Sequence, residues 1–327
     1  RFKPFFYTFA ENDRQIMGNF FTSLFSSNKG EENNKEKIEQ KNFDILKYDG
    51  VRAQKIGKHA YAIKCFNEAL NLQEDFETLG FLVTSYTVTN QLEEALEAAS
   101  RMVGLNPDNT GARLTRIQLL FMLDRDKEVI DDCQHIIQAE PENYIAFYQM
   151  AKAKRATGDQ FGAIADLTKA ITLKEDFPNA YLLRAEILKD MRQAEEALKD
   201  VEQAIQLAPE EENGFLLRGK IHMMLGDTEK AQADFQQTLE LNPFNEEAQL
   251  LPIQLQINEG EYAEAIKALD EIIENNPEFA KAYELRGQVK NLRGDKAGAF
   301  EDLKKAVELD PNGDVAQKMN GQHSNFD

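Results

Sequence analysis

The sequence contains no tryptophan, only two cysteines and only nine prolines in 327 residues. Cys65 and Cys133 are far apart and have no cysteine or histidine at metal-ligand spacing, so we expect two buried reduced thiols and neither a disulfide framework nor a metal site. No apolar run approaches the roughly 18 residues that a membrane-spanning helix needs. The sequence therefore predicts no transmembrane helix.

Positive charge is also scarce. The chain has 38 Lys and Arg against 57 Asp and Glu, a formal net charge of -19. A chain this acidic repels phosphate backbones, so general nucleic-acid binding is not expected. Hydrophobic residues make up 42% of the sequence, which is enough for a core and excludes global disorder.

The few prolines mark an internal repeat. Six of the nine close a similar three-residue phrase, and successive phrases lie 34 residues apart or 68, a double step. These prolines are Pro107, Pro141, Pro209, Pro243, Pro277 and Pro311. The missing member falls at Glu175, and one more step back, of 33 residues, reaches Glu74. A fixed period of this length indicates an array of repeated supersecondary units.

Two further columns share the period. Twelve residues before each of these sites lies a mostly small residue: Ala62, Ala95, Val129, Ala163, Ala197, Ala231, Ala265 and Ala299. Five residues earlier lies a column of residues that mostly tolerate a left-handed backbone: Gly57, Asn90, Asp124, Gly158, Arg192, Gly226, Gly260 and Gly294. We call these the alanine column and the turn column.

Each repeat is predicted to form two amphipathic helices joined by a tight turn, because apolar residues recur at spacings of three and four on both sides of the turn column. Asp159, Asp227 and Asp295 follow the turn at the position that caps a second helix. The proline ends that helix. Alanine in its middle allows the first helix to approach closely. The predicted fold class is therefore all-α.

The repeats resemble the tetratricopeptide repeat (TPR) family, in a bacterial-type form. That family has an aromatic residue at repeat position 4, small residues at position 8, alanine at 20, an aromatic or apolar residue at 24 and proline at 32. Position 4 holds Phe147, Tyr181, Phe215 and Tyr283, and position 8 holds Gly50, Ala151, Ala185, Gly219 and Gly287. The resemblance implies an α-solenoid of eight tandem helix-turn-helix repeats over residues 43–313, a right-handed superhelix with starts near residues 43, 76, 110, 144, 178, 212, 246 and 280.

Two repeats depart from the family pattern. The third has Arg113 at position 4, Ile117 at position 8 and Val129 in the alanine column. The seventh has Pro252 within its first helix, which predicts a late start or a kink there. These two repeats are the expected irregular joints of the array.

First helices line the concave groove in this family, and the resemblance places one set of residues there. The set combines an apolar stripe with flanking charges: Leu114, Phe121, Met122, Tyr148, Lys152, Arg155, Leu182, Glu186, Leu216, Lys220, Met223, Met224, Leu250 and Ile257. Two interpretations of the stripe stay open. It serves either the packing of neighbouring first helices or apolar pockets for a bound peptide.

A carboxylate clamp of the Hsp70/Hsp90-binding type is not expected. Lys47 occupies one clamp position, but Val51 replaces the asparagine that the clamp requires four residues later. Lys281 occupies another clamp position, but Leu285 replaces the arginine that the clamp requires four residues after it. Arginines recur at repeat position 7, and we expect each to pair with a glutamate or a helix end in the next repeat: Arg116, Arg184, Arg218 and Arg286.

Residues 1–42 and 314–327 lie outside the repeats. Residues 1–27 hold seven of the 21 phenylalanines, and residues 28–42 are polar, as in a flexible tether or a frayed helix. The sequence opens with Arg1, and Met17, followed by a possible myristoylation pattern, is the favoured start. Phe20, Phe21, Leu24 and Phe25 share a helical face that suits a lipidated anchor, a membrane-surface or partner-docking helix, or docking on the first repeat. Residues 314–327 are expected to form a short capping turn and tail.

The predicted function is a non-catalytic, cytoplasmic protein–protein interaction scaffold that binds a peptide or protein segment in its groove. The sequence shows no nucleophile–base set, phosphate loop or metal cluster, so no enzyme activity and no cofactor are expected. The alternative is an adaptor that is peripheral on a membrane surface and anchored through its phenylalanine-rich segment. The acidic surplus is expected on the outer surfaces of the array.

Overall fold

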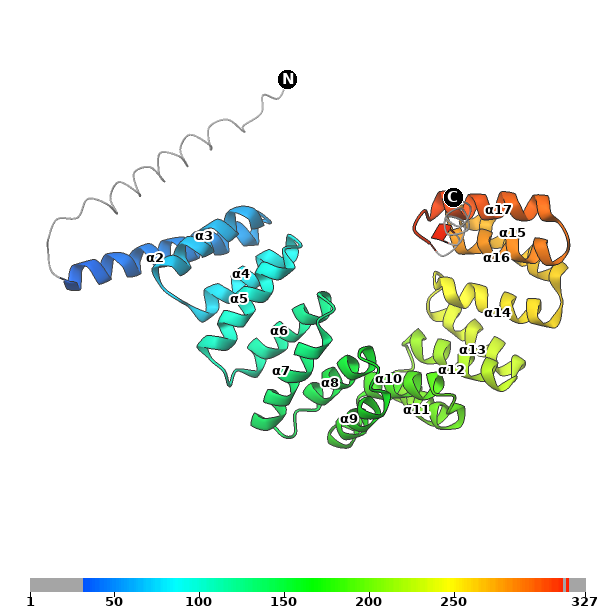
Figure 1. Ribbon diagram of the computed structural model, residues 1–327, viewed down its shortest axis with the longest axis horizontal. Helices are drawn as coiled ribbons and strands as arrows, with labels where there is room; N and C mark the ends of the chain where they lie inside the picture. Colours follow the sequence, from blue (N-terminus) through cyan, green and yellow to red (C-terminus); the bar gives the residue numbers. More distant parts are fainter. Residues whose placement is uncertain (1–31, 314–315, 318–327) are drawn as a thin grey trace, which may run out of the picture. The chain divides into compact units, whose positions relative to one another are not determined.

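The computed structural model describes residues 32–313 and 316–317, with side chains from residue 37 onward. These residues form sixteen helices in eight consecutive pairs and no strand (Figure 1). The first helices of the pairs are α2 (Glu32–Lys55), α4 (Phe76–Val88), α6 (Thr110–Met122), α8 (Tyr144–Ala156), α10 (Pro178–Asp190), α12 (Glu212–Leu225), α14 (Glu246–Glu259) and α16 (Ala280–Leu292). The second helices are α3 (His59–Leu72), α5 (Leu92–Leu105), α7 (Asp126–Ala139), α9 (Gln160–Leu173), α11 (Ala194–Leu207), α13 (Thr228–Leu241), α15 (Tyr262–Asn275) and α17 (Lys296–Leu309).

Seven of the eight first helices begin at the residue where the repeat pattern places a start. The exception is α2, which begins at Glu32 and crosses the expected start at residue 43. Residues 32–42 are therefore helical and not a flexible tether, because Glu, Lys and Gln are strong helix formers that extend the first helix backwards. Residues 1–31 lie outside the described part of the chain.

The chain divides into two compact units, residues 1–124 and residues 125–327, which we call unit 1 and unit 2. The described part of unit 1 contains α2–α6, and that of unit 2 contains α7–α17. The boundary falls inside the third repeat, one of the two with an irregular sequence pattern. In the seventh repeat the expected late start is wrong: α14 begins at Glu246 and continues past Pro252.

The turn column has the backbone conformation that its composition predicts. All eight of its residues have positive φ, from 55° at Asp124 to 87° at Gly158. Asn90 and Arg192, with φ of 57° and 63°, occupy the left-handed region without being glycine. A residue in this conformation ends the first helix of each pair and reverses the chain into the second.

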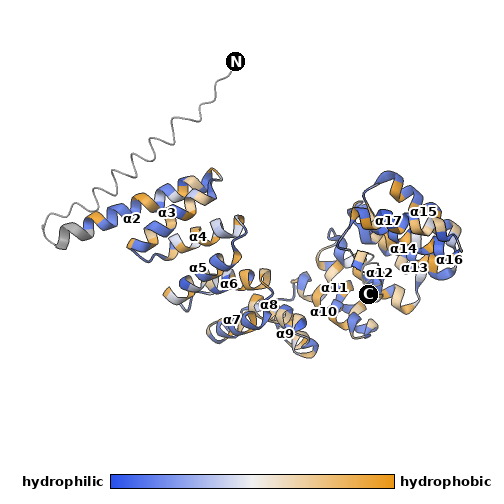
Figure 2. Cartoon of the chain, turned by 45° about the horizontal axis from the view of Figure 1, so that its top comes forward, coloured by the Kyte–Doolittle hydropathy of each residue, from blue (hydrophilic) through white to orange (hydrophobic). Residues whose placement is uncertain are grey.

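Small residues allow the two helices of each repeat to pack closely. The alanine column is buried throughout, with exposed fractions of 0% except 4% at Ala299. At position 8, a Cβ on Gly50 would lie 2.5 Å from the ring of Phe66, and one on Gly219 would lie 2.5 Å from the ring of Phe235. These aromatic rings therefore fill the space that glycine leaves. Figure 2 shows hydrophobic and hydrophilic residues alternating around the helices, as this packing requires.

Two of the three predicted second-helix caps form. The carboxylates of Asp159 and Asp295 each accept a hydrogen bond at 2.9 Å, from the backbone N–H groups of Gly162 and Gly298. A Cβ at either glycine would lie within 2.3 Å of the capping carboxylate. The side chain of Asp227 makes no such bond and lies instead 3.2 Å from Lys230, which occupies the equivalent third position and carries the obstructing Cβ.

The predicted capping turn at the C-terminus is described only at residues 316–317. Ala316 is buried, with 2% of its surface exposed. The side-chain amide of Gln317 donates a hydrogen bond of 2.9 Å to the backbone carbonyl of Asn312. These contacts tie residues 316–317 to the end of the last repeat.

Candidate peptide-binding groove

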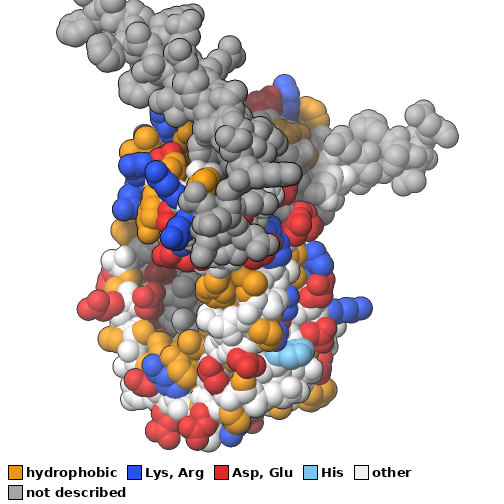
Figure 3. Space-filling view, turned by 90° about the vertical axis from the view of Figure 1, so that its left-hand side faces the viewer, with side chains coloured by type: hydrophobic (Ala, Val, Ile, Leu, Met, Phe, Trp, Pro, Cys, Tyr) orange, Lys and Arg blue, Asp and Glu red, His pale blue; other side chains and the backbone are white. Residues whose placement is uncertain are grey.

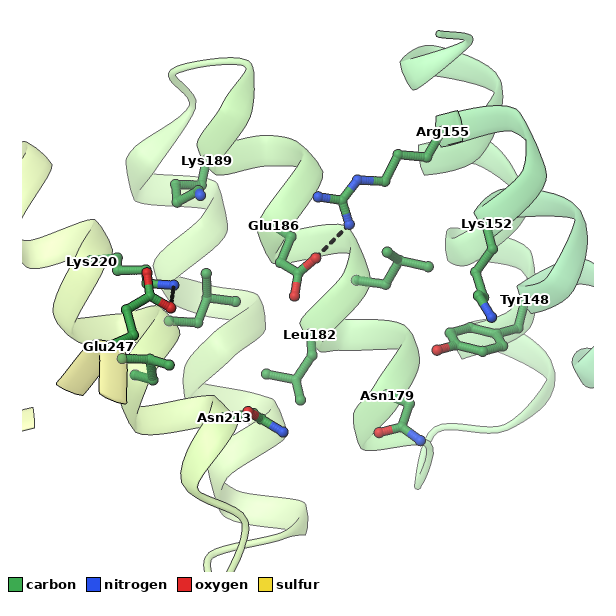
Figure 4. Close-up of a pocket in the computed structure, with 13 residues that line it drawn as sticks. Tyr148, Lys152, Arg155, Asn179, Leu182, Glu186, Lys189, Asn213, Lys220 and Glu247 are labelled. Atoms are coloured by element: carbon green, nitrogen blue, oxygen red, sulfur yellow. Dashed lines mark hydrogen bonds and ion pairs between the residues drawn. The ribbon is translucent and has the colours of Figure 1, made fainter. Parts of the chain in front are cut away.

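The first helices of unit 2 form a hollow with a volume of about 590 Å³. Helices α8, α10, α12 and α14 each contribute side chains to it, one helix from each of four successive repeats. The lining residues are Tyr148, Lys152, Arg155, Asn179, Leu182, Leu183, Glu186, Lys189, Asn213, Leu216, Leu217, Lys220 and Glu247 (Figure 4). A second hollow of about 460 Å³ lies between α14 and α16. It also includes Glu247, so the two hollows adjoin along one row of first helices.

The apolar floor of the first hollow is also part of the packing between repeats. Leu216 is only 7% exposed and belongs to a core cluster with Phe235 and Leu255. Leu182 packs against the neighbouring core cluster. Tyr148 lies edge-on to Phe177, with 5.0 Å between ring centroids. The packing interpretation of the stripe therefore holds for these three side chains, which leave only part of their surface available to a ligand.

The charged side chains of the hollow pair across repeats. Arg155 on α8 forms ion pairs with Glu186 and, at 3.3 Å, with Asp190, both on α10. Lys220 on α12 pairs with Glu247 on α14 at 2.6 Å. Figure 4 shows the Arg155–Glu186 link near the middle of the view and the Lys220–Glu247 link at its left. Because cation and anion come from successive first helices, these pairs link the repeats and offset much of the charge within the hollow.

The sequence suggested that each position-7 arginine pairs with a glutamate or a helix end in the next repeat. Three of them instead bind an aspartate on the second helix of their own repeat, sixteen residues later. The pairs are Arg184 with Asp200, Arg218 with Asp234 and Arg286 with Asp302, with closest N–O distances of 2.7, 2.7 and 2.6 Å. These aspartates are buried, so the arginines are structural and do not line the hollows.

The structure brings together only part of the predicted groove set. Seven members line the first hollow: Tyr148, Lys152, Arg155, Leu182, Glu186, Leu216 and Lys220. Leu250 lines the second. Met223, Met224 and Ile257 line neither, and Leu114, Phe121 and Met122 lie on α6 in unit 1. The proposed docking residues Phe20, Phe21, Leu24 and Phe25 lie outside the described residues.

Sequence reasoning missed the two asparagines of the hollow. Asn179 and Asn213 both occupy position 2 of their repeats, 34 residues apart, and both are exposed. Figure 4 places them on either side of Leu182. Neither side-chain amide has a hydrogen-bond partner among the described residues. The available signal was their shared position in successive first helices, the helices that the resemblance assigned to the groove.

Lys47, the residue at a clamp position in unit 1, forms ion pairs with carboxylates of the first two repeats. Its ammonium group lies 2.9 Å from Asp75 and 2.6 Å from Glu77. Burial alone would lower the pKa of Lys47, but the hydrogen bonds to Glu77 and Asp75 outweigh it and raise the pKa above its ordinary value. Lys47 is thus held as a structural cation between α2 and α4.

The two cysteines are buried free thiols, as expected. Burial is the main cause that raises the pKa of both, to about 12 for Cys133. Within the described residues, no group of His, Cys, Asp and Glu side chains is arranged to hold a metal ion. Nor does any described helix carry an apolar stretch long enough to cross a bilayer.

Comparisons with known proteins agree with the repeat architecture. Models of the tetratricopeptide repeat match residues 178–211, 222–289 and 280–312. DnaJ homolog subfamily C member 3 from Mus musculus and from Homo sapiens is 41% identical over 61 residues, which is 19% of this chain. That match spans 12% of the length of these relatives, so it extends to a short stretch of repeats and not to the whole proteins.

Solved structures share the fold over a larger part of the chain. A tetratricopeptide repeat protein from Parabacteroides merdae has a TM-score of 0.60 and 18% identity, covering 85% of this chain and 97% of that one. A chain of the Cut9–Hcn1 assembly of the APC/C has a TM-score of 0.55 and 14% identity, and the match covers 81% of this chain and 52% of that one. PilF of Pseudomonas aeruginosa has a TM-score of 0.51 and 16% identity, and the match covers 66% of this chain and 99% of that one.

Stacked helix pairs of this kind generally act as non-catalytic protein-interaction scaffolds, because they present an extended surface along one row of helices. The eight helix pairs, the eight left-handed turns and the buried alanine column all follow one period here. The repeat models match the sequence over part of this array, and the solved structures share its fold. Residues 178–211 and 222–312 therefore match the tetratricopeptide repeat, and the described residues have the fold of tetratricopeptide repeat proteins.

Proposed function

We propose that unit 2 holds an extended peptide segment of a protein partner along its row of first helices, with the 590 Å³ hollow as the main site. The observation that carries this proposal is the pair of exposed, unpartnered amides of Asn179 and Asn213 in that hollow. They are one repeat apart, and a peptide laid across the helices would meet both.

Side-chain amides suit the recognition of a peptide main chain. An asparagine amide can donate to a peptide carbonyl and accept from a peptide N–H. Extended peptides present both groups with their side chains alternating to either side. The apolar surface that Tyr148 and Leu182 leave open would then receive one side chain of the peptide. Burial, together with the nearby Glu186 charge, raises the pKa of Tyr148, so this phenol stays neutral beside the ligand.

The charge of the groove changes along the row of helices. The first hollow contains four cations, Lys152, Arg155, Lys189 and Lys220, and two carboxylates, Glu186 and Glu247. The second contains three carboxylates, Glu246, Glu247 and Glu284, and one cation, Lys281. The ion pairs offset part of this difference, and the remaining charge favours a peptide with acidic residues over α8–α12 and basic residues over α14–α16, which would give the peptide a direction.

The experiment selects 12-residue peptides from a random displayed library on the full chain, with counter-selection on the Asn179→Ala/Asn213→Ala variant. Affinities of the selected peptides are measured by fluorescence anisotropy. Loss of two peptide hydrogen bonds should weaken binding at least about tenfold. Exchange of the acidic and basic ends of a peptide should also weaken it.

The matched control is Gln232→Ala/Asn291→Ala, which removes two exposed amides that line neither hollow. This control should bind like the unmodified chain. Selected peptides that bind the Asn179→Ala/Asn213→Ala variant equally well would contradict the proposal. Leu216→Asp is unsuitable as a probe, because Leu216 is a core residue and the change would unfold the repeat.

A cytoplasmic location and the absence of nucleic-acid partners remain predictions from the sequence. The proposal assigns no catalytic step to the chain.

A further inference from the structure

A second surface, in unit 1, has a different chemistry from the groove. Along α2, six exposed side chains recur at alternating spacings of three and four, which places them on one face of the helix: Ile38, Lys41, Ile45, Tyr48, Arg52 and Lys55. Ile38, Ile45 and Tyr48 are 53%, 42% and 59% exposed. No described element of unit 1 covers this face, which we call the α2 face.

The exposed charges of the segment that carries this face are basic, although the chain is acidic. Among described residues 37–64, the exposed charged side chains are six cations and no carboxylate: Lys37, Lys41, Arg52, Lys55, Lys58 and Lys64. The three carboxylates of this stretch, Glu39, Asp44 and Asp49, are half-buried. Asp49 pairs with Arg52, and Asp44 accepts a hydrogen bond from Gln40. Figure 3 shows Lys and Arg side chains beside hydrophobic ones, together with Asp and Glu side chains, on the side of the chain that faces its viewer.

We infer that the α2 face docks on an anionic membrane surface, a role separate from the proposed peptide groove in unit 2. Exposed isoleucines and a tyrosine can enter the interfacial region of a bilayer, while flanking lysines and arginine contact lipid phosphates. The local charge decides in favour of this ligand. The net charge of -19 makes an anionic surface repel most of the chain. The chain would therefore approach such a surface with this basic face.

Other occupants fit the α2 face less well. A second copy would bring Lys41, Arg52 and Lys55 against their own equivalents, and like charges across a helix pair are unfavourable. Nucleic acid would match the cations but leaves three exposed aliphatic and aromatic side chains without a role. The chain's own phenylalanine-rich segment would match the isoleucines, but would bury lysines against apolar rings.

The preceding sequence adds a second apolar element. Phe25 lies twelve residues before Lys37 in the sequence, and Phe20, Phe21 and Leu24 lie close before it. Stable attachment to a membrane generally requires two signals, for example an inserted apolar segment and a basic patch. The α2 face would supply the second signal.

The test is flotation of the full 327-residue chain with vesicles of phosphatidylcholine alone and of phosphatidylcholine with about 30% phosphatidylserine, a composition whose surface potential is strongly negative. The chain should float with the anionic vesicles and not with the neutral ones. Lys41→Glu/Lys55→Glu should reduce the partition coefficient at least about 20-fold, because each basic residue near the surface contributes strongly to binding. Ile38→Ser/Ile45→Ser should reduce it as well.

The control is Lys169→Glu/Lys199→Glu, which changes the net charge equally at exposed lysines on α9 and α11. Circular dichroism of each variant verifies that the helices are intact. Failure of the unmodified chain to bind anionic vesicles would overturn the inference. Equal losses in the α2-face variant and the control would also overturn it, as would vesicle binding that depends on Phe20 and Phe25 but not on Lys41 and Lys55.

Discussion

Arg218 binds both carboxylate oxygens of Asp234, with Nη2 2.7 Å from Oδ1 and Nε 3.0 Å from Oδ2. The two residues lie on α12 and α13, the two helices of one repeat. The guanidinium carbon of Arg218 is also 5.5 Å from the centre of the Phe215 ring. The same fork recurs in the fifth and eighth repeats, so this link holds the first helix of a repeat to its second.

Arg218→Met should lower the free energy of unfolding by about 2–4 kcal/mol, because it leaves a buried carboxylate without its main cation. Asp234 is only 5% exposed. The measurement is urea unfolding followed by circular dichroism. Lys305→Met is the control, since Lys305 and Glu308 form an exposed pair that should contribute at most about 1 kcal/mol. Equal effects of the two changes would mean that the fork does not stabilise the repeat.

The sequence predicts the helices well because each repeat carries nearly the same pattern of residues. A residue with positive φ recurs in all eight repeats, a buried alanine in seven and a terminating proline in six, all at fixed offsets, so the repeats reinforce a weak local signal. These features are local, and each acts within a few residues of its own position. Helix starts could therefore be placed to the residue at seven of eight sites.

Contacts between helices were harder to predict. The partner of Arg218 was expected in the next repeat, but the spacing of sixteen residues to Asp234 depends on how the two helices pack, which no local pattern states. Leu216 was assigned to the groove although it is buried, because one helix position faces both the groove and the next repeat. Asn179 and Asn213 were missed because a neutral polar amide adds neither to the charges nor to the apolar stripe that the sequence assigned to the groove.

Two buried aspartates should respond oppositely to pH. Burial would raise the pKa of Asp302, but hydrogen bonds from Arg286 and Lys290 outweigh it and hold the pKa below its ordinary value. Burial raises the pKa of Asp166, and its one partner, Lys154 at 2.7 Å, offsets this only in part. The ionised form of Asp302 therefore stabilises the fold, and that of Asp166 opposes it.

Asp302→Asn should thus lower the urea midpoint at pH 7, and this loss should shrink as pH falls below about 4 and through the lower pKa of the folded state. Asp166→Asn should cost less at pH 7, or stabilise. As pH falls from 7 through the raised pKa of Asp166, the unmodified chain should gain stability relative to that variant. A loss at pH 7 that is as large for Asp166→Asn as for Asp302→Asn would contradict the assignment.

The two thiols should resist modification in the folded protein. With a pKa of about 12, Cys133 carries roughly a thousandfold less thiolate at pH 8 than an ordinary cysteine. It is also fully buried, whereas Cys65 is 5% exposed. Reaction with Ellman's reagent should be slow in buffer and fast in urea, with Cys65 modified first as judged by peptide mass spectrometry. Rapid reaction of Cys133 without denaturant would show that α7 opens readily.

Gly219 and Phe235 offer the most direct test of how the repeats are packed. A Cβ on Gly219 would lie 2.5 Å from Cε1 of Phe235, so Gly219→Ala should destabilise by about 1–2 kcal/mol through overpacking. The fourth and fifth repeats carry alanine at this position opposite the smaller Leu167 and Val201. Phe235→Leu should therefore relieve the strain.

The double-mutant cycle gives the decisive number. Phe235→Leu alone should cost about 1–2 kcal/mol through lost packing, and the two changes together should cost less than their sum by at least about 0.5 kcal/mol. Gly104→Ala is the matched control, because a Cβ at Gly104 on α5 meets no atom within 4 Å. That change should stabilise by about 0.5 kcal/mol, since alanine favours helix over glycine. If the losses in unfolding free energy are additive, the residue tolerated at position 8 does not depend on the size of the side chain at position 24.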